Sequence, residues 1–220
     1  RQRQMCIRDR LGGAKQKITK KRADKIGEVE CLHPVMVGLE IAGNGEVMQA
    51  SSGLPDSWFI HDGQITKQAI RALTLSSLAP KAGEHLWDLG AGSGSIGIEW
   101  LLSGPLMRAT AVEKQPNRVD NIRQNATILG VDHLVVVESD IIDAIYKLEK
   151  PDCIFIGGGL SERLLDLLWM HMSDGTRLVA NAVTIETDRL LTSIQPRFGG
   201  SIQRLEISNL QEIGAKHGWK

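Results

Sequence analysis

The stretch LWDLGAGSGSIGIEW, residues 86–100, constrains the fold of this chain more than any other part of the sequence. A short apolar run ends at Asp88, glycines follow at alternate positions, and Ile96, Glu99 and Trp100 then recur at helical spacing. This order predicts a strand, a tight turn and the start of a helix. Glycine suits such a turn because it tolerates backbone angles that a Cβ disfavours and lets a ligand approach the main chain. The unpaired N–H groups at the start of the helix favour a polar or anionic ligand group.

The glycines can be read in two registers, which predict different cofactors. Gly97, with the second and third glycines of the loop, fits the G-x-G-x-x-G spacing of dinucleotide sites. Asp88 and the three loop glycines fit instead the D-x-G-x-G-x-G pattern of S-adenosylmethionine (SAM) enzymes. The second register places a carboxylate where it can meet the cationic amino group of the cofactor, whereas a pyrophosphate would be repelled there. We therefore favour SAM, held by Gly90, Ala91, Gly92, Ser93 and Gly94.

Composition excludes several other classes of protein. The 220 residues suffice for one well-buried domain, with a remainder too short for a second. No apolar run approaches the length of a membrane span. The three cysteines are scattered outside any C-x-x-C pair, so they indicate neither a disulfide framework nor a zinc site, and the six histidines show no ligand spacing. We expect a cytoplasmic protein without a membrane segment or a metal.

The amino-terminal part of the chain is strongly basic. Residues 1–27 contain ten Lys or Arg against two Asp, so this arm could contact nucleic acid. A solvated segment is the favoured interpretation, because no aromatic residue for base stacking is interleaved with the charges. Residues 1–10 show no hydrophobic periodicity and differ in character from the rest of the chain, so they are left unassigned. We expect a short helix within residues 11–27 and a strand at residues 35–41.

From Leu54 onward, short apolar runs alternate with amphipathic stretches. Thr66 is the expected N-cap of a helix to about residue 78, with Ile70, Leu73 and Ser77 on its apolar face. Strands are expected at about residues 85–88, 109–112, 134–137, 152–156, 177–183 and 202–207, with helices between them, one of them from Pro116 to residue 129. This alternation predicts an α/β fold with a doubly wound, mostly parallel sheet, the Rossmann-like class I SAM-dependent methyltransferase type.

Acidic residues and glycines follow the predicted strands, where a parallel sheet gathers its ligand-binding residues. Glu113 closes the second strand and can accept the hydroxyls of a ribose. Asp140 follows the third, where it could meet an adenine amino group or cap a helix. After the fourth strand stand Gly157, Gly158 and Gly159 instead of an N-P-P-Y-type sequence, which disfavours a flipped nucleic-acid base and leaves room for a bulky acceptor.

Four stretches together carry a resemblance to a known family. They are residues 54–67 (LPDSWFIHDGQITK), the glycine loop, residues 156–159 and residues 179–187 (VANAVTIET). In this order they resemble the carboxyl-terminal module of the precorrin-6Y C5,15-methyltransferases (decarboxylating) of cobalamin biosynthesis, and the similar stand-alone decarboxylating C15-methyltransferases. The resemblance covers about residues 54–213. Residues 11–53 resemble the end of an upstream tetrapyrrole methylase domain plus a linker, and residues 54–220 a methyltransferase domain that we expect to be truncated at its carboxyl end.

The resemblance implies an activity and a set of site residues. The activity is SAM-dependent methylation at C15 of a precorrin, a tetrapyrrole, with loss of carbon dioxide from its C12 acetate side chain. By matched position it places Thr66, the glycine loop, Glu113 and Ile141 around the cofactor, and the three glycines after the fourth strand and Asn181 on the substrate side. It also leads us to expect a homo-oligomer.

Decarboxylation would be helped by a general acid near the macrocycle. His61, Asp62 and Glu186 are the candidates, although His61 also suits a hydrogen-bonded loop histidine. Possible anchors for the carboxylates of the substrate are Lys67, Arg71 and Arg189, whose commoner role is surface solvation. Two other interpretations stay open, namely a SAM enzyme that acts on RNA through the basic arm and a fragment that binds SAM without turnover.

Overall fold

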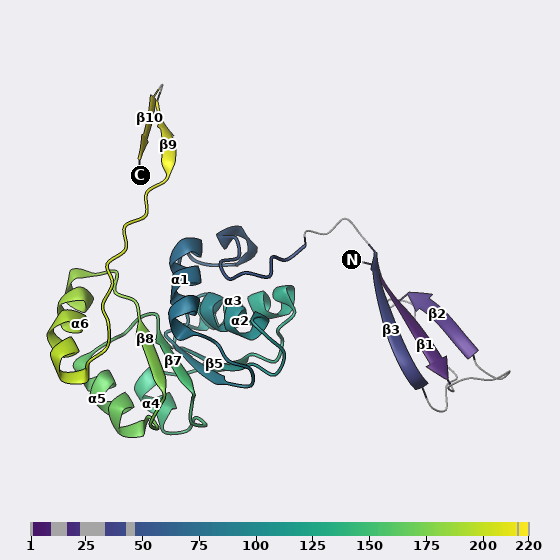
Figure 1. Ribbon diagram of the computed structural model, residues 1–220, viewed down its shortest axis with the longest axis horizontal. Helices are drawn as coiled ribbons and strands as arrows, with labels where there is room; N and C mark the ends of the chain where they lie inside the picture. The colour runs from purple at the N-terminus through teal and green to yellow at the C-terminus, as the bar shows by residue number, and fades with distance from the viewer. Residues whose placement is uncertain (1, 10–16, 23–33, 43–46, 215, 220) are drawn as a thin grey trace. The chain divides into compact units, whose positions relative to one another are not determined.

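A computed structural model describes residues 2–9, 17–22, 34–42, 47–214 and 216–219, and the chain divides into two units, Arg1–Met48 and Gln49–Lys220. In the first unit, β1 (Gln2–Asp9) lies between β2 (Lys17–Arg22) and β3 (Pro34–Ala42) in an antiparallel sheet (Figure 1). The strand expected at residues 35–41 is confirmed. The prediction of a short helix within residues 11–27 is wrong where β2 forms, and β1 forms in a stretch without hydrophobic periodicity. In both strands the backbone N–H and C=O groups are satisfied by pairing with neighbouring strands.

The second unit contains a five-stranded parallel sheet (Figure 1). Its strands are β4 (His85–Leu89), β5 (Arg108–Glu113), β6 (Val135–Glu138), β7 (Cys153–Ile156) and β8 (Arg177–Ala180). Their order is β6-β5-β4-β7-β8, so the chain builds outward from β4 on one side and then returns to build on the other. The point of reversal lies between β4 and β7, where doubly wound sheets bind ligands. The predicted fold class is confirmed.

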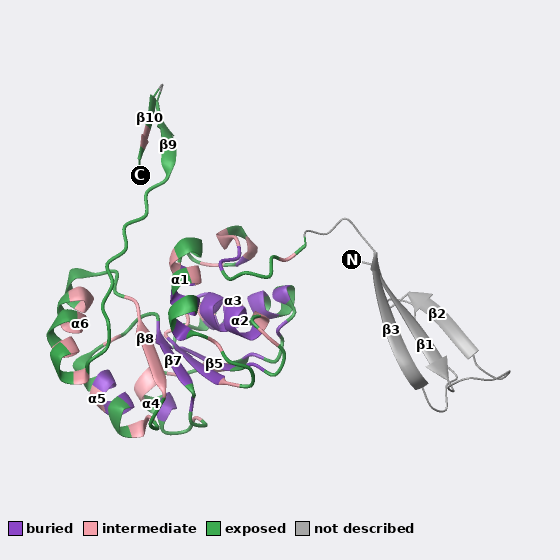
Figure 2. Ribbon diagram, viewed as in Figure 1, coloured by how far each residue is buried: buried purple, intermediate pink, exposed green. Residues whose placement is uncertain are grey.

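Helices cover both faces of this sheet. Those on one face are α1 (Gln68–Leu78), α2 (Ser95–Leu102) and α3 (Pro116–Leu129), and those on the other are α4 (Ile141–Ile145) and α5 (Glu162–His171), while α6 (Ile185–Phe198) packs beside α5. All residues of α2 from Ser95 to Leu101 are buried. A cluster including Trp87, Ile154 and Leu168 fills the space under α4 and α5. The buried centre of the sheet in Figure 2 is typical of parallel sheets covered on both faces.

The ends of the helices show where local sequence signals determine the structure and where they do not. Pro116 is the first residue of α3, and Gly130 ends that helix in the left-handed conformation at φ 75°, both as predicted. For α1 the predicted N-cap is wrong by one residue: Lys67 is the N-cap, with no side-chain cap hydrogen bond, and the carbonyl of Thr66 accepts a hydrogen bond from Arg71. The predicted face of α1 is also wrong, since α1 buries Arg71, Thr74, Leu75 and Leu78.

The sixth predicted strand, residues 202–207, is not formed. Gly199 and Gly200 have φ of 74° and 84° and turn the chain after α6, and residues 201–209 then run without regular structure. No described strand pairs with β8 on that side, so β8 is an edge of the sheet as described. Farther along, β9 (Leu210–Ile213) and β10 (Lys216–Trp219) pair in an antiparallel hairpin. None of the helices in the described residues is long and apolar enough to span a bilayer.

Candidate functional site

A cavity of about 1820 Å³ begins at the carboxyl ends of the parallel strands and continues along β8 to α5, α6 and residues 198–205. Its wall includes most of the residues that the sequence predicts for the site: Thr66, Gly90, Ala91, Gly92, Ser93, Glu113, Asp140, Ile141, Gly157, Gly158, Gly159 and Asn181. Seven predicted residues are not on that wall as far as the structure describes the chain: His61, Asp62, Arg71, Asp88, Gly94, Glu186 and Arg189. Segments from five separate strand ends therefore meet around one cavity.

The loop after β4 forms the floor of the cavity and depends on glycine. Gly90 has φ of 70°, and a Cβ built there would lie 2.8 Å from the carbonyl oxygen of Gly158. The N–H groups of Gly90 and Ala91 donate to the carbonyl of Val112 at 2.9 and 3.1 Å, which fixes the loop to β5. The loops after β4 and β7 thus touch through their backbones, and any side chain at Gly90 would separate them.

Asp88 lies beneath this loop rather than beside the cavity. It is 1% exposed, and its Oδ2 accepts a hydrogen bond from the N–H of Gly97 at 2.9 Å, while no partner for Oδ1 is found in the described residues. Burial raises the pKa of this carboxyl to about 7. The sequence suggests a direct contact between Asp88 and the cofactor's amino group, but in this structure the carboxyl orients the first turn of α2.

Glu113 joins the end of β5 to the glycine loop. Its Oε2 accepts from the N–H of Gly92 at 3.0 Å, and its Oε1 accepts from the N–H groups of Lys114 and Gln115 at 2.9 and 3.0 Å. An ionised carboxylate has about four acceptor sites, so roughly one remains for a ligand hydroxyl. Accepting both hydroxyls of a ribose, as the sequence suggests, would require Glu113 to release a main-chain N–H.

Asp140 serves as a helix cap and also borders the cavity. Its Oδ1 accepts from the N–H of Ile142 at 3.0 Å, which caps α4, and the next residue, Ile141, lies on the same wall. The exposed carboxylate has a second oxygen for which no partner is found among the described residues. The two interpretations of Asp140, cap and ligand-binding residue, are therefore compatible.

The loop after β7, which touches the glycine loop, and the end of β8 form a further part of the wall. A Cβ at Gly157 would lie 3.1 Å from the carbonyl oxygen of Gly90, whereas one at Gly158 would meet nothing within 4 Å. Gly157 therefore serves the contact between the two loops, and Gly158 leaves open space. Asn181 donates from Nδ2 to Oγ1 of Thr74 at 3.0 Å, which fixes its amide beside the cavity.

The three candidate proton donors are not brought together. His61 accepts at Nδ1 from the N–H of Gly63 at 3.0 Å, the loop arrangement that the sequence left open. Asp62 accepts from the N–H of Gln64 at 3.0 Å and from Nε of Arg118 at 2.7 Å. These two contacts, the backbone one first, hold the pKa of Asp62 below its usual value, so its carboxyl carries no proton near neutral pH.

The other predicted polar residues differ in how far their side chains are exposed. Glu186 is exposed in the first turn of α6, and Arg189 is exposed on the same helix, outside the cavity wall of the described residues. Lys67 borders the cavity and is exposed. Surface solvation, the commoner role given for Arg71, is wrong because this side chain is 0% exposed, and Arg71 does not line the cavity where it could anchor substrate.

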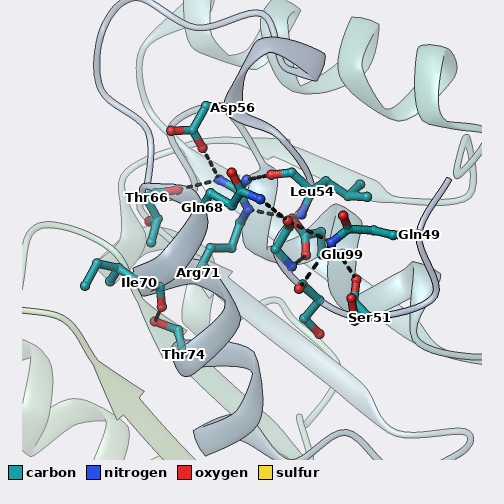
Figure 3. Close-up of polar contacts among 12 residues, drawn as sticks. Gln49, Ser51, Leu54, Asp56, Thr66, Gln68, Ile70, Arg71, Thr74 and Glu99 are labelled. Atoms are coloured by element: carbon teal, nitrogen blue, oxygen red, sulfur yellow. Dashed lines mark hydrogen bonds and ion pairs between the residues drawn. The ribbon is translucent and has the colours of Figure 1, made fainter. Parts of the chain in front are cut away.

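Arg71 belongs to a buried polar cluster that sequence reasoning missed (Figure 3). Its Nε donates to Oε1 of Glu99 at 2.6 Å, and a terminal nitrogen donates to Oδ1 of Asp56 at 3.1 Å. Its guanidinium also donates to the carbonyls of Leu54 and Thr66. The one available signal was Glu99, an acid within an otherwise apolar helix, which requires a buried partner.

The residues around the cavity fit a nucleoside cofactor with a methionine side chain better than a metal. Gly92 has φ of 60° and leaves the floor free of a side chain, and Glu113 retains an acceptor for a hydroxyl. No group of three or more His, Cys, Asp or Glu residues that could hold a metal ion occurs in the described part of the chain. The carboxylates of Glu113 and Asp140 disfavour a pyrophosphate at this edge.

Comparison with known proteins identifies relatives with this organisation. Residues 57–220 match a family described as "Precorrin methyltransferase domain". The precorrin-6Y C(5,15)-methyltransferase [decarboxylating] of Sinorhizobium sp. is 43% identical over all of this chain, which spans 54% of that protein. The cobalt-precorrin-6B C(15)-methyltransferase (decarboxylating) of Salmonella typhimurium is 30% identical over 71% of this chain and 83% of its own length. The chain thus spans about half the length of the C(5,15) relative and most of the C(15) relative.

Solved structures agree with the sequence matches. The carboxyl-terminal domain of precorrin-6Y C5,15-methyltransferase from Rhodobacter capsulatus superposes with a TM-score of 0.76 and 44% identity, covering 79% of this chain and 94% of that one. A SAM-dependent O-methyltransferase from Thermotoga maritima shares the fold, with a TM-score of 0.59 at 16% identity over 71% of this chain and 60% of that one. The chain belongs to the precorrin methyltransferase domain family.

Proposed function

We propose that residues 54–220 bind SAM and methylate C15 of a precorrin, with loss of carbon dioxide from its C12 acetate side chain. The observation that carries this proposal is that the glycine loop, Glu113, Asp140 and the glycines after β7 line one cavity, whose volume is about 1820 Å³. The cavity exceeds the usual size of a ligand pocket, about 300–1,000 Å³, because it continues from the strand ends along β8 to α5, α6 and residues 198–205, and we propose that the part at the strand ends holds the cofactor. The cavity borders the ends of β4 and β7, between which the strand order reverses, and doubly wound sheets bind their ligands at such a point.

The C15 reaction is favoured over the C5 reaction by the extent of the matches. The chain corresponds to most of the Salmonella protein, whose name specifies C(15) and decarboxylation, but to only part of the C(5,15) enzymes. We propose that residues 11–53 are the end of an upstream tetrapyrrole methylase domain plus linker. Residues 1–10, which the sequence left unassigned, contain β1, which pairs with β2 and β3 in the same unit. Methylation at C5 would then require sequence outside this chain.

The cofactor's sulfonium supplies an electrophilic methyl group when SAM is bound. We propose that the protein holds it through Thr66, Glu113, Asp140 and Ile141 and the residues of the glycine loop. Glu113 would accept from a ribose hydroxyl, and the free oxygen of Asp140 from the adenine amino group. Asp88 would support this site indirectly, because its carboxyl holds the first turn of α2 through the N–H of Gly97.

On the acceptor side the protein positions the macrocycle and excludes water. We propose that Gly158, Gly159 and Asn181 border the macrocycle, since they line the cavity at the ends of β7 and β8. His61 and Glu186 stay as proposed proton donors. Asp62, which is ionised near neutral pH, would instead position the loop that carries His61.

The test is mass spectrometry of products after anaerobic incubation of the chain with SAM and a precorrin-6-type substrate. Gain of one methyl and loss of one carbon dioxide would support the proposal, and Glu113→Ala should abolish both changes by removing the ribose acceptor. SAM binding without any product would favour the fragment that binds without turnover, and methylation of RNA instead of precorrin would favour the alternative based on the basic arm. Light scattering on the same sample tests the expected homo-oligomer.

A further inference from the structure

Residues 53–66, here called the lead-in segment, form part of the cavity wall without belonging to the sheet. Gly63, Gln64, Ile65 and Thr66 border the cavity, and the segment contains only one short turn of 3₁₀ helix, Asp56–Trp58. A segment with so little regular structure must be held in place by contacts with its surroundings. Side chains of α1, α2 and α3 supply these contacts at three separate points.

The first point is buried and ionic. Oε2 and Oε1 of Glu99 accept from the N–H groups of Gly53 and Leu54 at 2.6 and 2.9 Å, and Arg71 binds the same carboxylate (Figure 3). The guanidinium carbon of Arg71 also lies 4.7 Å from the centre of the Phe59 ring. This point fixes the beginning of the lead-in segment to α1 and α2.

The second point joins the lead-in segment directly to the glycine loop. Asn125 of α3 is 0% exposed, and its Oδ1 accepts from the N–H of Ile60 at 2.7 Å. Its Nδ2 donates to the carbonyls of Ile60 and Ser93, both at 2.9 Å. One side-chain amide therefore sets the distance between the lead-in segment and the loop proposed to hold the cofactor.

The third point lies at the cavity itself. Arg118, also on α3, donates from Nε to Oδ2 of Asp62 at 2.7 Å and from a terminal nitrogen to Oε1 of Gln64 at 2.9 Å. The carbonyl oxygen of Gln64 lies 3.8 Å from the position of a Cβ built on Gly92. The end of the lead-in segment therefore passes close to the glycine loop, and Arg118 determines where it lies.

We propose that Arg118 and Asn125 are positioning residues for the cofactor: they hold the wall that carries Thr66 against the loop that carries Gly92. The role rests on the proposed function, because SAM is the ligand between these two elements. Arg118 acts through Asp62 and Gln64 at the rim, and Asn125 acts through Ile60 and Ser93 in the interior. Loss of either contact leaves the sheet intact but lets the wall move away from the floor.

The test compares Arg118→Gln with Arg123→Gln on the full chain. Arg123 is on the same helix, is 54% exposed at its side chain and, among the described residues, forms an ion pair only with Asp120 of α3, at 3.5 Å. Isothermal titration calorimetry should show SAM affinity lowered about tenfold or more in Arg118→Gln, the order expected for losing charge-assisted hydrogen bonds, and unchanged in Arg123→Gln. Arg118→Lys should be intermediate, since an ammonium can still bind Asp62 but lacks the second, forked contact.

A second measurement separates this role from the proposed function. Amide hydrogen exchange without ligand should be faster at residues 60–66 in Arg118→Gln than in Arg123→Gln, with equal melting temperatures for both. Equal exchange, or wild-type SAM affinity in Arg118→Gln, would overturn the positioning role. If the unaltered chain bound no SAM, the proposed function would fail, while the exchange result would still decide whether Arg118 holds the wall. Asp62→Asn, which removes the charge from the other partner, should reproduce the change in exchange.

Discussion

Arg71 carries a positive charge with none of its side chain exposed, so its partners must replace the hydrogen bonds and the charge stabilisation that water would provide. Replacing it with Met leaves the Glu99 carboxylate buried with only the N–H groups of Gly53 and Leu54. Breaking a buried ion pair costs about 3–5 kcal/mol, which we expect as the loss of unfolding free energy in Arg71→Met by urea denaturation. Arg123→Met, at an exposed site, should change it by less than about 0.5 kcal/mol. A loss below about 1 kcal/mol in Arg71→Met would contradict the role assigned to this pair.

Asp88 gives the stability of the fold a specific dependence on pH. Burial raises its pKa to about 7 from 3.8, so the folded state favours the neutral carboxyl. The stability that this group contributes is complete below pH 3.8 and is lost as the pH rises through about 7. Asp88→Asn stays neutral, so its melting temperature should fall less than that of the wild type between about pH 5 and about pH 8. A cost of the substitution that does not depend on pH shifts the melting temperature equally at every pH and leaves the slope unchanged. Parallel plots of melting temperature against pH for the two proteins would therefore refute the raised pKa of Asp88.

The site residues that could be predicted from the sequence are those that directly follow a strand, because the topology of the sheet fixes their position. Glu113 and Asp140 end successive strands, and parallel strands bring such positions to one edge whatever the details of packing. Arg118 and Asn125 carried no such signal, because the residues that they bind lie 32–65 positions away in the chain. Pairings of that kind depend on how α3 packs against the lead-in segment, which no local pattern records.

At the scale of elements, the contact between the loops after β4 and β7 can be tested with a single methyl group. In Gly90→Ala the new Cβ would lie 2.8 Å from the carbonyl oxygen of Gly158, so one backbone must move. Gly175→Ala is the matched control, since Gly175 also has positive φ, 86°, but nothing lies within 4 Å of its Cβ position. The control should lose about 1–2 kcal/mol of unfolding free energy from strain alone. Gly90→Ala should lose more and also fail to bind SAM in calorimetry; equal effects would argue against the loop contact.

Sequence periodicity predicted the elements well where their ends are marked by local chemistry, as Pro116 and Gly130 mark α3. It failed for the face of α1, because that interpretation assumes that apolar residues point inward. In the structure Ile70 and Leu73 border the cavity, while Arg71 is buried because acids distant in sequence neutralise it. It failed for residues 202–207 because a strand requires a paired neighbour, and none forms beside β8 in the described part of the chain.

At the scale of the whole molecule, the described cavity lies entirely within the unit Gln49–Lys220. We therefore expect a chain of residues 49–220 to unfold cooperatively, with the same melting temperature for the cavity-bearing unit as the full chain, and to bind SAM with the same affinity. Differential scanning calorimetry and titration with SAM check both points. A lower SAM affinity in the shorter chain would show that residues 1–48 contribute to the site and would contradict the proposed division into domains.

The amino-terminal boundary of the functional unit follows from the same contacts. The family match begins at residue 57, but Gly53 and Leu54 precede it and both bind Glu99. A chain of residues 56–220 would lose the burial of the Leu54 side chain, which is 2% exposed, at about 1.5–3 kcal/mol, and two hydrogen bonds to a buried carboxylate as well. Urea denaturation should therefore find it less stable than residues 49–220 by about 3 kcal/mol or more. Equal stability would mean that Arg71 alone satisfies Glu99 and that the lead-in segment contributes only its cavity-facing residues.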